Sequence, residues 1–402
     1  MATKWIRAVG ALSGALLLAA CSGGGGHSGG SSAGGSGGGT AAQAAAKTSA
    51  AVVDIEPKNG TQDVAPSGAL KVSVASGKLT GVTVKGSDGS TVNGTLSPDG
   101  SSWTPAGNLS VSDTYQVSAQ AVDAKGVTST TTSSFTTLTP TKTAHSEDNI
   151  TTGSTYGVGM IIQLEFGQRV TNKDAVAQAI TVTASDGSQV KGHWFNEDNW
   201  YELRPQNFWT PGTQVTVHIR LKSVEISPGV YGGSDRDETF TIGRSQVSTV
   251  DAAAHTMTVV TNGSQTQVIP VTTGASDPAN WATYNGTMVI ERMEGTVEMK
   301  SSTVPGLGGA SYDEMVPHSM RLTDSGTYVH GNYWAAGAYG HENVSHGCIG
   351  LQDVEGGSPS SSAGKMYAES MVGDVVIVKN STGPQVDPGN GLSGWNIPWS
   401  NW

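Results

Sequence analysis

Two short stretches in the last quarter of the chain combine the residue types that nucleophilic catalysis requires. The first is residues 328–332, Tyr-Val-His-Gly-Asn, and the second is residues 345–351, Ser-His-Gly-Cys-Ile-Gly-Leu. Cys348 is one of only two cysteines in the protein. An unpaired cysteine in an exported protein is either a small buried hydrophobic residue or a reactive group. A thiol with an unperturbed pKa of about 8.5 is only a few per cent thiolate at neutral pH, so a neighbouring imidazole would make it a useful nucleophile.

Three histidines, His330, His341 and His346, lie near Cys348 in the sequence and favour the reactive interpretation. His330 is expected to end a strand over residues 327–330, and an imidazole on a rigid strand is a better-placed base than one on a mobile loop. His346 lies two residues before Cys348, where it would shape the turn and assist electrostatically. His341 is interpreted as a hydrogen-bonded loop residue.

Gly347 directly precedes Cys348 and permits a tight backbone turn there. A thiol exposed on such a turn leaves consecutive backbone N–H groups free. These groups are candidate oxyanion-hole donors, which stabilise developing negative charge by several kcal/mol when they point at it.

The ordered pattern of the two stretches resembles a known catalytic signature. A His-Gly pair is followed by a glycine-rich spacer and then by Ser-His-Gly-Cys and an aliphatic residue. This arrangement resembles the signature of the L,D-transpeptidases, the YkuD-type cysteine enzymes of bacterial cell walls. The resemblance runs from about Arg244 to the C-terminus, and the whole chain is similar to the lipid-anchored actinobacterial members.

The resemblance implies a reaction and its catalytic residues. Cys348 would attack the carbonyl between the third residue of a peptidoglycan tetrapeptide stem and its terminal D-alanine. His330 would be the base, oriented by the backbone carbonyl of Gly331. The side-chain amine of a neighbouring stem would resolve the thioester into a third-to-third cross-link, with no metal or organic cofactor. Carbapenem β-lactams are implied as covalent inhibitors of the same thiol.

The resemblance also implies substrate contacts. Tyr312 falls where the family has a tyrosine that contacts the substrate, although it is nearly as consistent with lid packing. Ser325 and Gly326 fall where the family makes backbone contacts to the donor peptide. Gly350 stands where many relatives have Asn or Arg, so only its backbone would be available for substrate binding.

Several alternatives remain open on the same residues. His330, His341, His346 and Cys348 have the types and number of zinc ligands, but their spacing matches no common zinc motif. The chain could instead be a non-enzymatic wall-binding lipoprotein with a degenerate third domain. A transpeptidase site of this type is also compatible with L,D-carboxypeptidase activity or with attachment of proteins to peptidoglycan.

Length and composition limit the fold and the partners. A chain of 402 residues is too long for one core, so two or three domains are expected. The 55 glycines and a charged fraction of 14% suit loop-rich all-β domains better than helical ones. A net charge of −11 argues against nucleic acid or anionic lipid as the main partner, because both select a basic surface.

The N-terminal region has the features of a lipoprotein export signal. Residues 1–21 begin with Lys4 and Arg7, continue with a short apolar run and end in Leu-Ala-Ala-Cys at residues 18–21. This ending resembles a bacterial lipobox, in which Cys21 would be lipidated and would anchor the protein on the outer face of the cell membrane. The alternative is an ordinary secretory signal with an incidental cysteine. Residues 22–50 are almost entirely Gly, Ser, Ala and Thr and are expected to form a disordered tether.

Two tandem immunoglobulin-like β-sandwiches are predicted over residues 51–139 and 140–243. Short alternating strands separated by turn residues are typical of such domains. A Ser-Asp-Gly turn and a Gln-Val pair recur in both segments at one constant offset, which favours a repeat. The second copy has an aromatic cluster, interpreted mainly as core and interdomain packing rather than a glycan platform: Trp194, Phe195, Trp200, Tyr201, Phe208 and Trp209.

The catalytic domain is predicted over residues 244–378 and is expected to be mainly β, with strands at 256–260, 267–271 and 287–290. A short helix is possible at 363–370. The tail, 379–402, contains Trp395, Trp399 and Trp402, whose apolar surface is costly to leave in water. We therefore expect an all-β protein with a C-terminal tail docked on its body.

Overall fold

The computed structural model describes residues 47–195, 199–301 and 313–402. The predicted signal peptide, Cys21, most of the tether and Tyr312 lie outside these residues. The chain divides into two compact units, Met1–Lys47 and Thr48–Trp402, and all elements described below belong to the second. No helix in the described ranges is long and apolar enough to cross a membrane.

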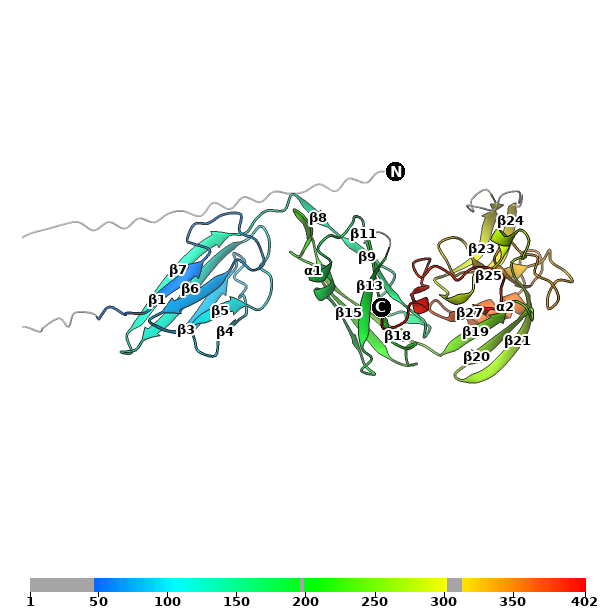
Figure 1. The fold of residues 1–402 in the computed structure, drawn as a ribbon, viewed down its shortest axis with the longest axis horizontal. Helices are drawn as coiled ribbons and strands as arrows, with labels where there is room; N and C mark the ends of the chain where they lie inside the picture. The colour runs from blue at the N-terminus through cyan, green and yellow to red at the C-terminus, as the bar shows by residue number, and fades with distance from the viewer. Residues whose placement is uncertain (1–46, 196–198, 302–312) are drawn as a thin grey trace, which may run out of the picture. The chain divides into compact units, whose positions relative to one another are not determined.

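The first sandwich consists of a four-stranded and a three-stranded sheet (Figure 1). The four-stranded sheet has the order β1 (Val52–Glu56), β2 (Lys71–Ala75), β5 (Ser102–Pro105) and β4 (Gly94–Leu96). The other sheet has the order β3 (Gly77–Lys85), β6 (Thr114–Asp123) and β7 (Thr128–Thr136). Alternate residues of β6 are buried, as a strand with one face on a core requires: Tyr115, Val117, Ala119 and Ala121.

The second sandwich contains two four-stranded sheets and a small three-stranded sheet. The first has the order β10 (Thr155–Tyr156), β18 (Asp235–Ile242), β15 (Gln214–Arg220) and β12 (Ile180–Ala184). The second has the order β13 (Val190–Phe195), β14 (Trp200–Pro205), β11 (Ile162–Phe166) and β9 (Ser146–Asp148). The third has the order β16 (Glu225–Ser227), β17 (Val230–Gly232) and β8 (Lys142–Ala144). A one-turn helix, α1 (Lys173–Gln178), was not predicted.

The repeated Ser-Asp-Gly turn has the same local structure in both sandwiches. Gly89 and Gly187 adopt φ of +81° and +77°, in the left-handed region that glycine occupies without strain. Asp88 and Asp186 each accept a hydrogen bond from the backbone N–H two residues later, at 2.8 and 3.0 Å. The repeat inferred from the sequence therefore reflects a common turn in two sandwiches.

The catalytic region is built on one nine-stranded sheet. Its order is β22 (Gly286–Val289), β27 (Val375–Lys379), β19 (Gln246–Asp251), β20 (Thr256–Thr261), β21 (Ser264–Thr272), β26 (Ile349–Gln352), β25 (Tyr328–Asn332), β24 (Asp313–Arg321) and β23 (Arg292–Lys300). The predicted short helix is present as α2 (Ser362–Glu369), capped by Ser361, whose hydroxyl accepts a hydrogen bond from the N–H of Gly364 at 2.9 Å. The expected mainly-β catalytic domain is confirmed.

The second sandwich and the catalytic region share a hydrophobic core. Val289 and Val375 of the catalytic sheet and Leu392 of the tail belong to the same buried cluster as the sandwich residues. Backbone N–H groups of Gly157 and Gly159 donate to the carbonyls of residues 372 and 373 at 2.8 Å. A Cβ on Gly157 would lie 2.4 Å from the N atom of Asp374, so the two backbones approach too closely for any other residue there. The second sandwich is therefore packed into the catalytic region and is more than a spacer.

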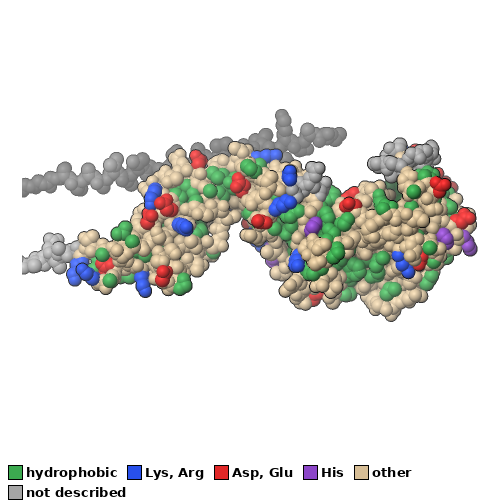
Figure 2. All heavy atoms as spheres, in the orientation of Figure 1, with side chains coloured by type: hydrophobic (Ala, Val, Ile, Leu, Met, Phe, Trp, Pro, Cys, Tyr) green, Lys and Arg blue, Asp and Glu red, His purple; other side chains and the backbone are tan. Residues whose placement is uncertain are grey.

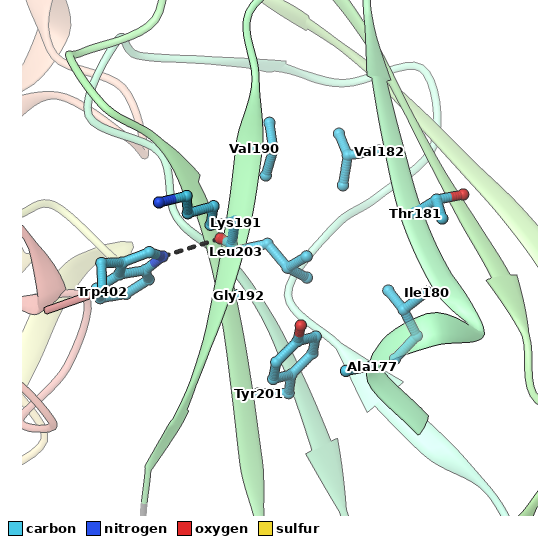
Figure 3. A pocket seen from close by; sticks show the side chains of 10 residues that line it. All are labelled: Ala177, Ile180, Thr181, Val182, Val190, Lys191, Gly192, Tyr201, Leu203 and Trp402. Atoms are coloured by element: carbon cyan, nitrogen blue, oxygen red, sulfur yellow. Dashed lines mark hydrogen bonds between the residues drawn. The ribbon is translucent and has the colours of Figure 1, made fainter. Parts of the chain in front are cut away.

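The C-terminal tail docks on the second sandwich, as predicted. The indole N–H of Trp395 donates to the carbonyl of Gly159, and that of Trp402 donates to the carbonyl of Lys191, each at 2.8 Å. Figure 3 shows the second contact beside a pocket of about 490 Å³ in the sandwich. The buried guanidinium of Arg204 lies 4.2 Å from the ring of Trp402 and 4.7 Å from that of Trp395. Cation–π contacts of this kind stabilise the docked tail.

The aromatic cluster of the second sandwich serves packing. Tyr201 and Trp209 are buried in the core. Phe208 packs against Trp395 of the tail, with ring centroids 4.7 Å apart. The favoured interpretation, core filling and interdomain contact, is therefore confirmed for these three residues. On the face shown in Figure 2, basic and acidic side chains are interspersed among a larger uncharged surface, as the low charged fraction predicts.

Candidate active site

Parallel pairing of β25 and β26 brings the two catalytic stretches together. Val329 pairs with Ile349, and His330 pairs with Gly350. Cys348 directly precedes β26, so it lies beside the start of β25. The strand does not end at His330 as expected but continues to Asn332. His330 is therefore an interior strand residue, only 3% exposed, and its imidazole is held more rigidly than one at a strand end.

The turn before Cys348 requires glycine and is fixed from several sides. Gly347 has φ of +123°, which L-amino acids with a side chain rarely adopt. Thr283 donates from its hydroxyl to the carbonyl of Gly347 at 2.9 Å, and Ser345 donates to the carbonyl of Cys348 at 2.6 Å. The N–H of Gly347 donates to the Ser345 hydroxyl at 3.3 Å. The expectation of consecutive free N–H groups is therefore wrong for Gly347, and the N–H of Cys348 is the candidate oxyanion donor in this turn.

The thiol of Cys348 is half-buried and hydrogen-bonded to the backbone. Its sulfur lies 3.6 Å from the carbonyl oxygen of Gly326, to which it donates a hydrogen bond. Burial raises the pKa of Cys348 to about 11, and a backbone hydrogen bond from Tyr328 opposes this rise. The raised pKa favours a protonated thiol over the resting thiolate that an activating imidazole would suggest. The proton must leave the sulfur during the reaction.

His330 is oriented by its neighbour in the way the resemblance implied. Its Nδ1 donates to the carbonyl oxygen of Gly331 at 2.9 Å. Burial lowers the pKa of His330, while the hydrogen bond to Gly331 opposes this effect. The ring is therefore neutral, with the lone pair on Nε2 available to accept a proton. A Cβ on Gly331 would lie 2.2 Å from Oδ2 of Asp353, so only glycine fits at this position.

His346 packs against an aromatic residue on the other side of the turn. Its ring centroid lies 4.1 Å from that of Trp281, and burial lowers its pKa. This position agrees with a role in shaping the turn.

His341 is exposed, and its backbone N–H donates to the carbonyl of Ala338. Within the described ranges, no group of three or more His, Cys, Asp or Glu residues is arranged to hold a metal ion, so the alternative zinc set is not assembled.

A pocket of about 1080 Å³ contains most of the predicted site residues. It is lined by His330, His346, Gly347 and Cys348, and by the predicted donor-binding segment at 325–326. Gly350 is buried away from this lining, and a Cβ there would lie 3.0 Å from both Asn332 and Thr272 side chains. The predicted substrate contact at Gly350 is therefore not supported by its position.

Three residues of the site were not identified from the sequence. Trp334 stacks on the His330 ring at 5.9 Å between centroids and lines the pocket. An aromatic residue four positions after the candidate base in the sequence was a signal from which this ring contact could have been predicted. Thr283 and Trp281 are separated from the turn they support by more than sixty residues and carry no local motif. Only the folded chain reveals their role.

Comparison with known proteins assigns the two parts of the chain. Residues 245–378 match the model of the L,D-transpeptidase catalytic domain, YkuD, and residues 61–225 match that of a bacterial Ig domain. The chain is 31% identical to L,D-transpeptidase 2 of Mycobacterium tuberculosis over 348 residues, covering 86% of this chain and 82% of that protein. It is 28% identical to L,D-transpeptidase 5 of the same species, covering 86% and 75%.

A solved structure of LD transpeptidase LdtMt1 in complex with imipenem aligns with a TM-score of 0.49 at 26% identity, covering 60% of this chain and all of that one. The assignment rests on the sequence matches, which extend over most of both proteins. On these matches the chain belongs to the L,D-transpeptidases, the cysteine acyltransferases that cross-link peptidoglycan.

Proposed function

We propose that Cys348 and His330 perform a two-step acyl transfer that joins the third residues of two peptidoglycan stems. The observation that carries this assignment is the hydrogen bond from His330 Nδ1 to the Gly331 carbonyl, 2.9 Å long. It leaves Nε2 of a neutral imidazole as the proton acceptor, in the same pocket as a neutral thiol. A neutral pair suits general-base catalysis, in which the proton moves as the sulfur attacks.

In the first step, the Cys348 sulfur bonds to the carbonyl carbon that links the third residue of the donor stem to D-alanine. The thiol proton passes to Nε2 of His330, and the carbonyl oxygen takes up negative charge. The N–H of Cys348 is the donor proposed for that oxygen. The C–N bond then breaks, the imidazolium returns its proton to the departing amine of D-alanine, and a thioester remains.

In the second step, the side-chain amine of an acceptor stem attacks the thioester carbon. His330 takes a proton from this amine, the C–S bond breaks, and the sulfur recovers the proton as a thiol. One amide bond is broken and one is formed, so no external energy source or cofactor enters the balance. Attack by water in place of the amine would give L,D-carboxypeptidase activity on the same site.

The donor stem is proposed to lie along residues 325–326. These two residues line the pocket, and the Gly326 carbonyl already contacts the nucleophile. A carbapenem would enter the same pocket and acylate Cys348, because its strained amide presents an electrophilic carbonyl. The imipenem complex of LdtMt1 provides a precedent for a protein of this family. Tyr312 remains a predicted substrate contact.

The protein is proposed to be lipid-anchored through Cys21 on the outer face of the cell membrane. The support is the sequence Leu-Ala-Ala-Cys at residues 18–21 and the Gly/Ser-rich segment that follows. Such a segment, about 29 residues long, has a root-mean-square length on the order of 30 Å as a flexible coil. This reach would let the catalytic region work on stems beyond the membrane surface.

Mass spectrometry of the products from purified tetrapeptide stems tests the proposed reaction. We expect dimers joined between third residues, together with released D-alanine, and Cys348→Ala should abolish both. The matched control is Cys21→Ser, which should leave turnover by the soluble protein intact. Tripeptides without dimers would identify a carboxypeptidase, and a carbapenem adduct on a residue other than Cys348 would contradict the assignment of the nucleophile.

A further inference from the structure

The turn between β24 and β25 forms a wall of the active site. Its Gly326 supplies the carbonyl oxygen that accepts the hydrogen bond from the Cys348 thiol. Residues 324–327 all line the pocket. The position of this turn therefore sets both the environment of the sulfur and the surface along which a donor stem would lie.

The turn is only partly fixed by its own hydrogen bonds. The N–H of Gly326 donates to the carbonyl of Thr323 at 3.1 Å, and the N–H of Thr327 donates to the Thr323 hydroxyl at 2.9 Å. Gly326 adopts φ of +95°, and a Cβ there would meet no atom within 4 Å. Asp324 and Ser325 are exposed. Arg321 at the end of β24 also holds the turn, because its Nη2 donates to the carbonyl of Asp324 at 2.8 Å, and the hydroxyls of Thr323 and Ser325 lie 3.2 Å apart.

The C-terminal tail attaches to the turn at Ser325 and Asp324. Oδ1 of Asn390 accepts a hydrogen bond from the N–H of Ser325 at 3.0 Å, and Nδ2 of Asn390 donates to the Ser325 hydroxyl at 2.8 Å. The next residue, Gly391, donates its N–H to Oδ2 of Asp324 at 3.1 Å. One amide side chain therefore satisfies two groups of Ser325 at once, which fixes the orientation as well as the distance of the turn.

The tail is itself fixed just beyond these contacts. Leu392 is buried in the core that the second sandwich shares with the catalytic region. Trp395 is hydrogen-bonded to the sandwich backbone at Gly159. Asn390 thus lies in a tail segment that is fixed on the sandwich, and it reaches from there to the exposed tip of the turn.

We propose that Asn390 is a positioning residue of the transpeptidase reaction, holding Ser325 and Gly326 in place against the Cys348 thiol. The inference rests on the proposed role of Cys348 as the nucleophile. It makes the tail part of the catalytic apparatus rather than only a stabilising element. Small displacements of such a positioning group can reduce rates strongly without changing the reacting residues.

The test compares Asn390→Ala with Asn401→Ala in the full-length protein. Asn401 is an exposed tail residue whose side chain contacts only Ser400 among the hydrogen bonds described. Two rates are measured as a function of pH: acylation of Cys348 by a carbapenem, and alkylation of Cys348 by iodoacetamide. Intact mass and peptide mapping confirm the modified residue.

At neutral pH, Asn390→Ala should be acylated by the carbapenem more slowly than the parent protein but alkylated by iodoacetamide faster. Carbapenem acylation should slow by about tenfold, because the donor-binding turn is no longer held in place. The pH midpoint of alkylation should fall, because an acceptor for the S–H stabilises the protonated thiol and its displacement favours the thiolate. General destabilisation would also expose the buried thiol and lower this midpoint, so the comparison holds for an Asn390→Ala protein whose melting temperature matches that of the parent. Asn401→Ala should match the parent protein in both measurements.

Unchanged acylation and an unchanged alkylation midpoint in a folded Asn390→Ala protein would overturn the proposal. If that variant does not fold, Ser325→Ala replaces it, since it removes the hydroxyl that accepts a hydrogen bond from Nδ2 of Asn390 and that lies 3.2 Å from the Thr323 hydroxyl. It should change both rates in the same directions but less, and parent-like rates in Ser325→Ala would overturn the proposal. An adduct on a residue other than Cys348 in the parent protein would instead refute the proposed function, and with it this role of Asn390.

Discussion

The Nδ1 atom of His330 donates a hydrogen bond to the carbonyl oxygen of its own neighbour, Gly331, at 2.9 Å. A backbone carbonyl accepts hydrogen bonds but carries no full charge, so it fixes the tautomer of the imidazole with little effect on its charge state. A carboxylate in this position would favour the imidazolium more strongly. A neutral imidazole is therefore paired with a neutral thiol, because burial raises the pKa of Cys348 to about 11.

This relationship predicts different pH responses for the two histidine variants. His330→Ala should reduce acylation at neutral pH by about 10²- to 10⁴-fold, the usual contribution of a general base. The rate should recover as the pH approaches the thiol pKa of about 11, because hydroxide then removes the proton. His346→Ala should lose rate through the disturbed packing against Trp281, which a higher pH does not repair. Recovery at high pH in His346→Ala but not in His330→Ala would reverse the two roles.

The buried Glu202 predicts a loss of stability at alkaline pH. Burial raises its pKa to about 8 from an ordinary value of 4.5. Between about pH 4.5 and 8, Glu202 therefore keeps its proton in the folded protein but has lost it in the unfolded chain. Its stabilising effect is complete below about pH 4.5 and disappears as the pH rises through about 8. Glu202→Gln should match the parent near pH 5 and exceed it by about 2 kcal/mol or more near pH 9.

Urea unfolding at both pH values measures this difference. Glu165→Gln on β11 is the matched control, because its side chain is exposed. We expect the control to follow the parent at both pH values. A parent protein whose unfolding free energy stays constant between the two pH values would contradict the assignment.

The shared core predicts different tolerances to truncation at the two domain boundaries. A chain that starts at Pro140 should keep its melting temperature and its acylation rate, because it retains every residue of the shared core. A chain that starts at Arg244 exposes Val289, Val375 and Leu392 together with the tryptophans of the tail. It should melt at least about 10 °C lower and acylate slowly, since each buried aliphatic side chain contributes about 1.5–3 kcal/mol. Equal melting temperatures of the two truncated chains would show that the second sandwich is a spacer after all.

The proposed lipid anchor predicts the behaviour of Cys21→Ser in cells. The variant should carry no lipid and should no longer be found in the membrane fraction. Its Cys348 should still be acylated by a carbapenem. Mass analysis of the N-terminal peptide and fractionation measure the two effects. A Cys21→Ser protein that still carries the lipid would refute the lipobox.

The sequence alone identified the features that depend on local pattern. Alternating residues predicted strands because successive side chains of a strand face opposite sides, and the repeated Ser-Asp-Gly turn predicted two related sandwiches. The Ser-His-Gly-Cys stretch and the His-Gly pair located the candidate nucleophile and base. These inferences need only the order of residues within short segments.

The tertiary structure decided the features that depend on contacts between distant segments. Only the parallel register of β25 and β26 places His330 beside Cys348, and only burial raises the pKa of that thiol. The contact of Asn390 with Ser325 joins residues 65 positions apart, without a motif in either segment. Such contacts arise when apolar surfaces of different elements are buried together, and the resulting loss of solvent raises the pKa of groups such as Cys348 and Glu202 that are enclosed with them.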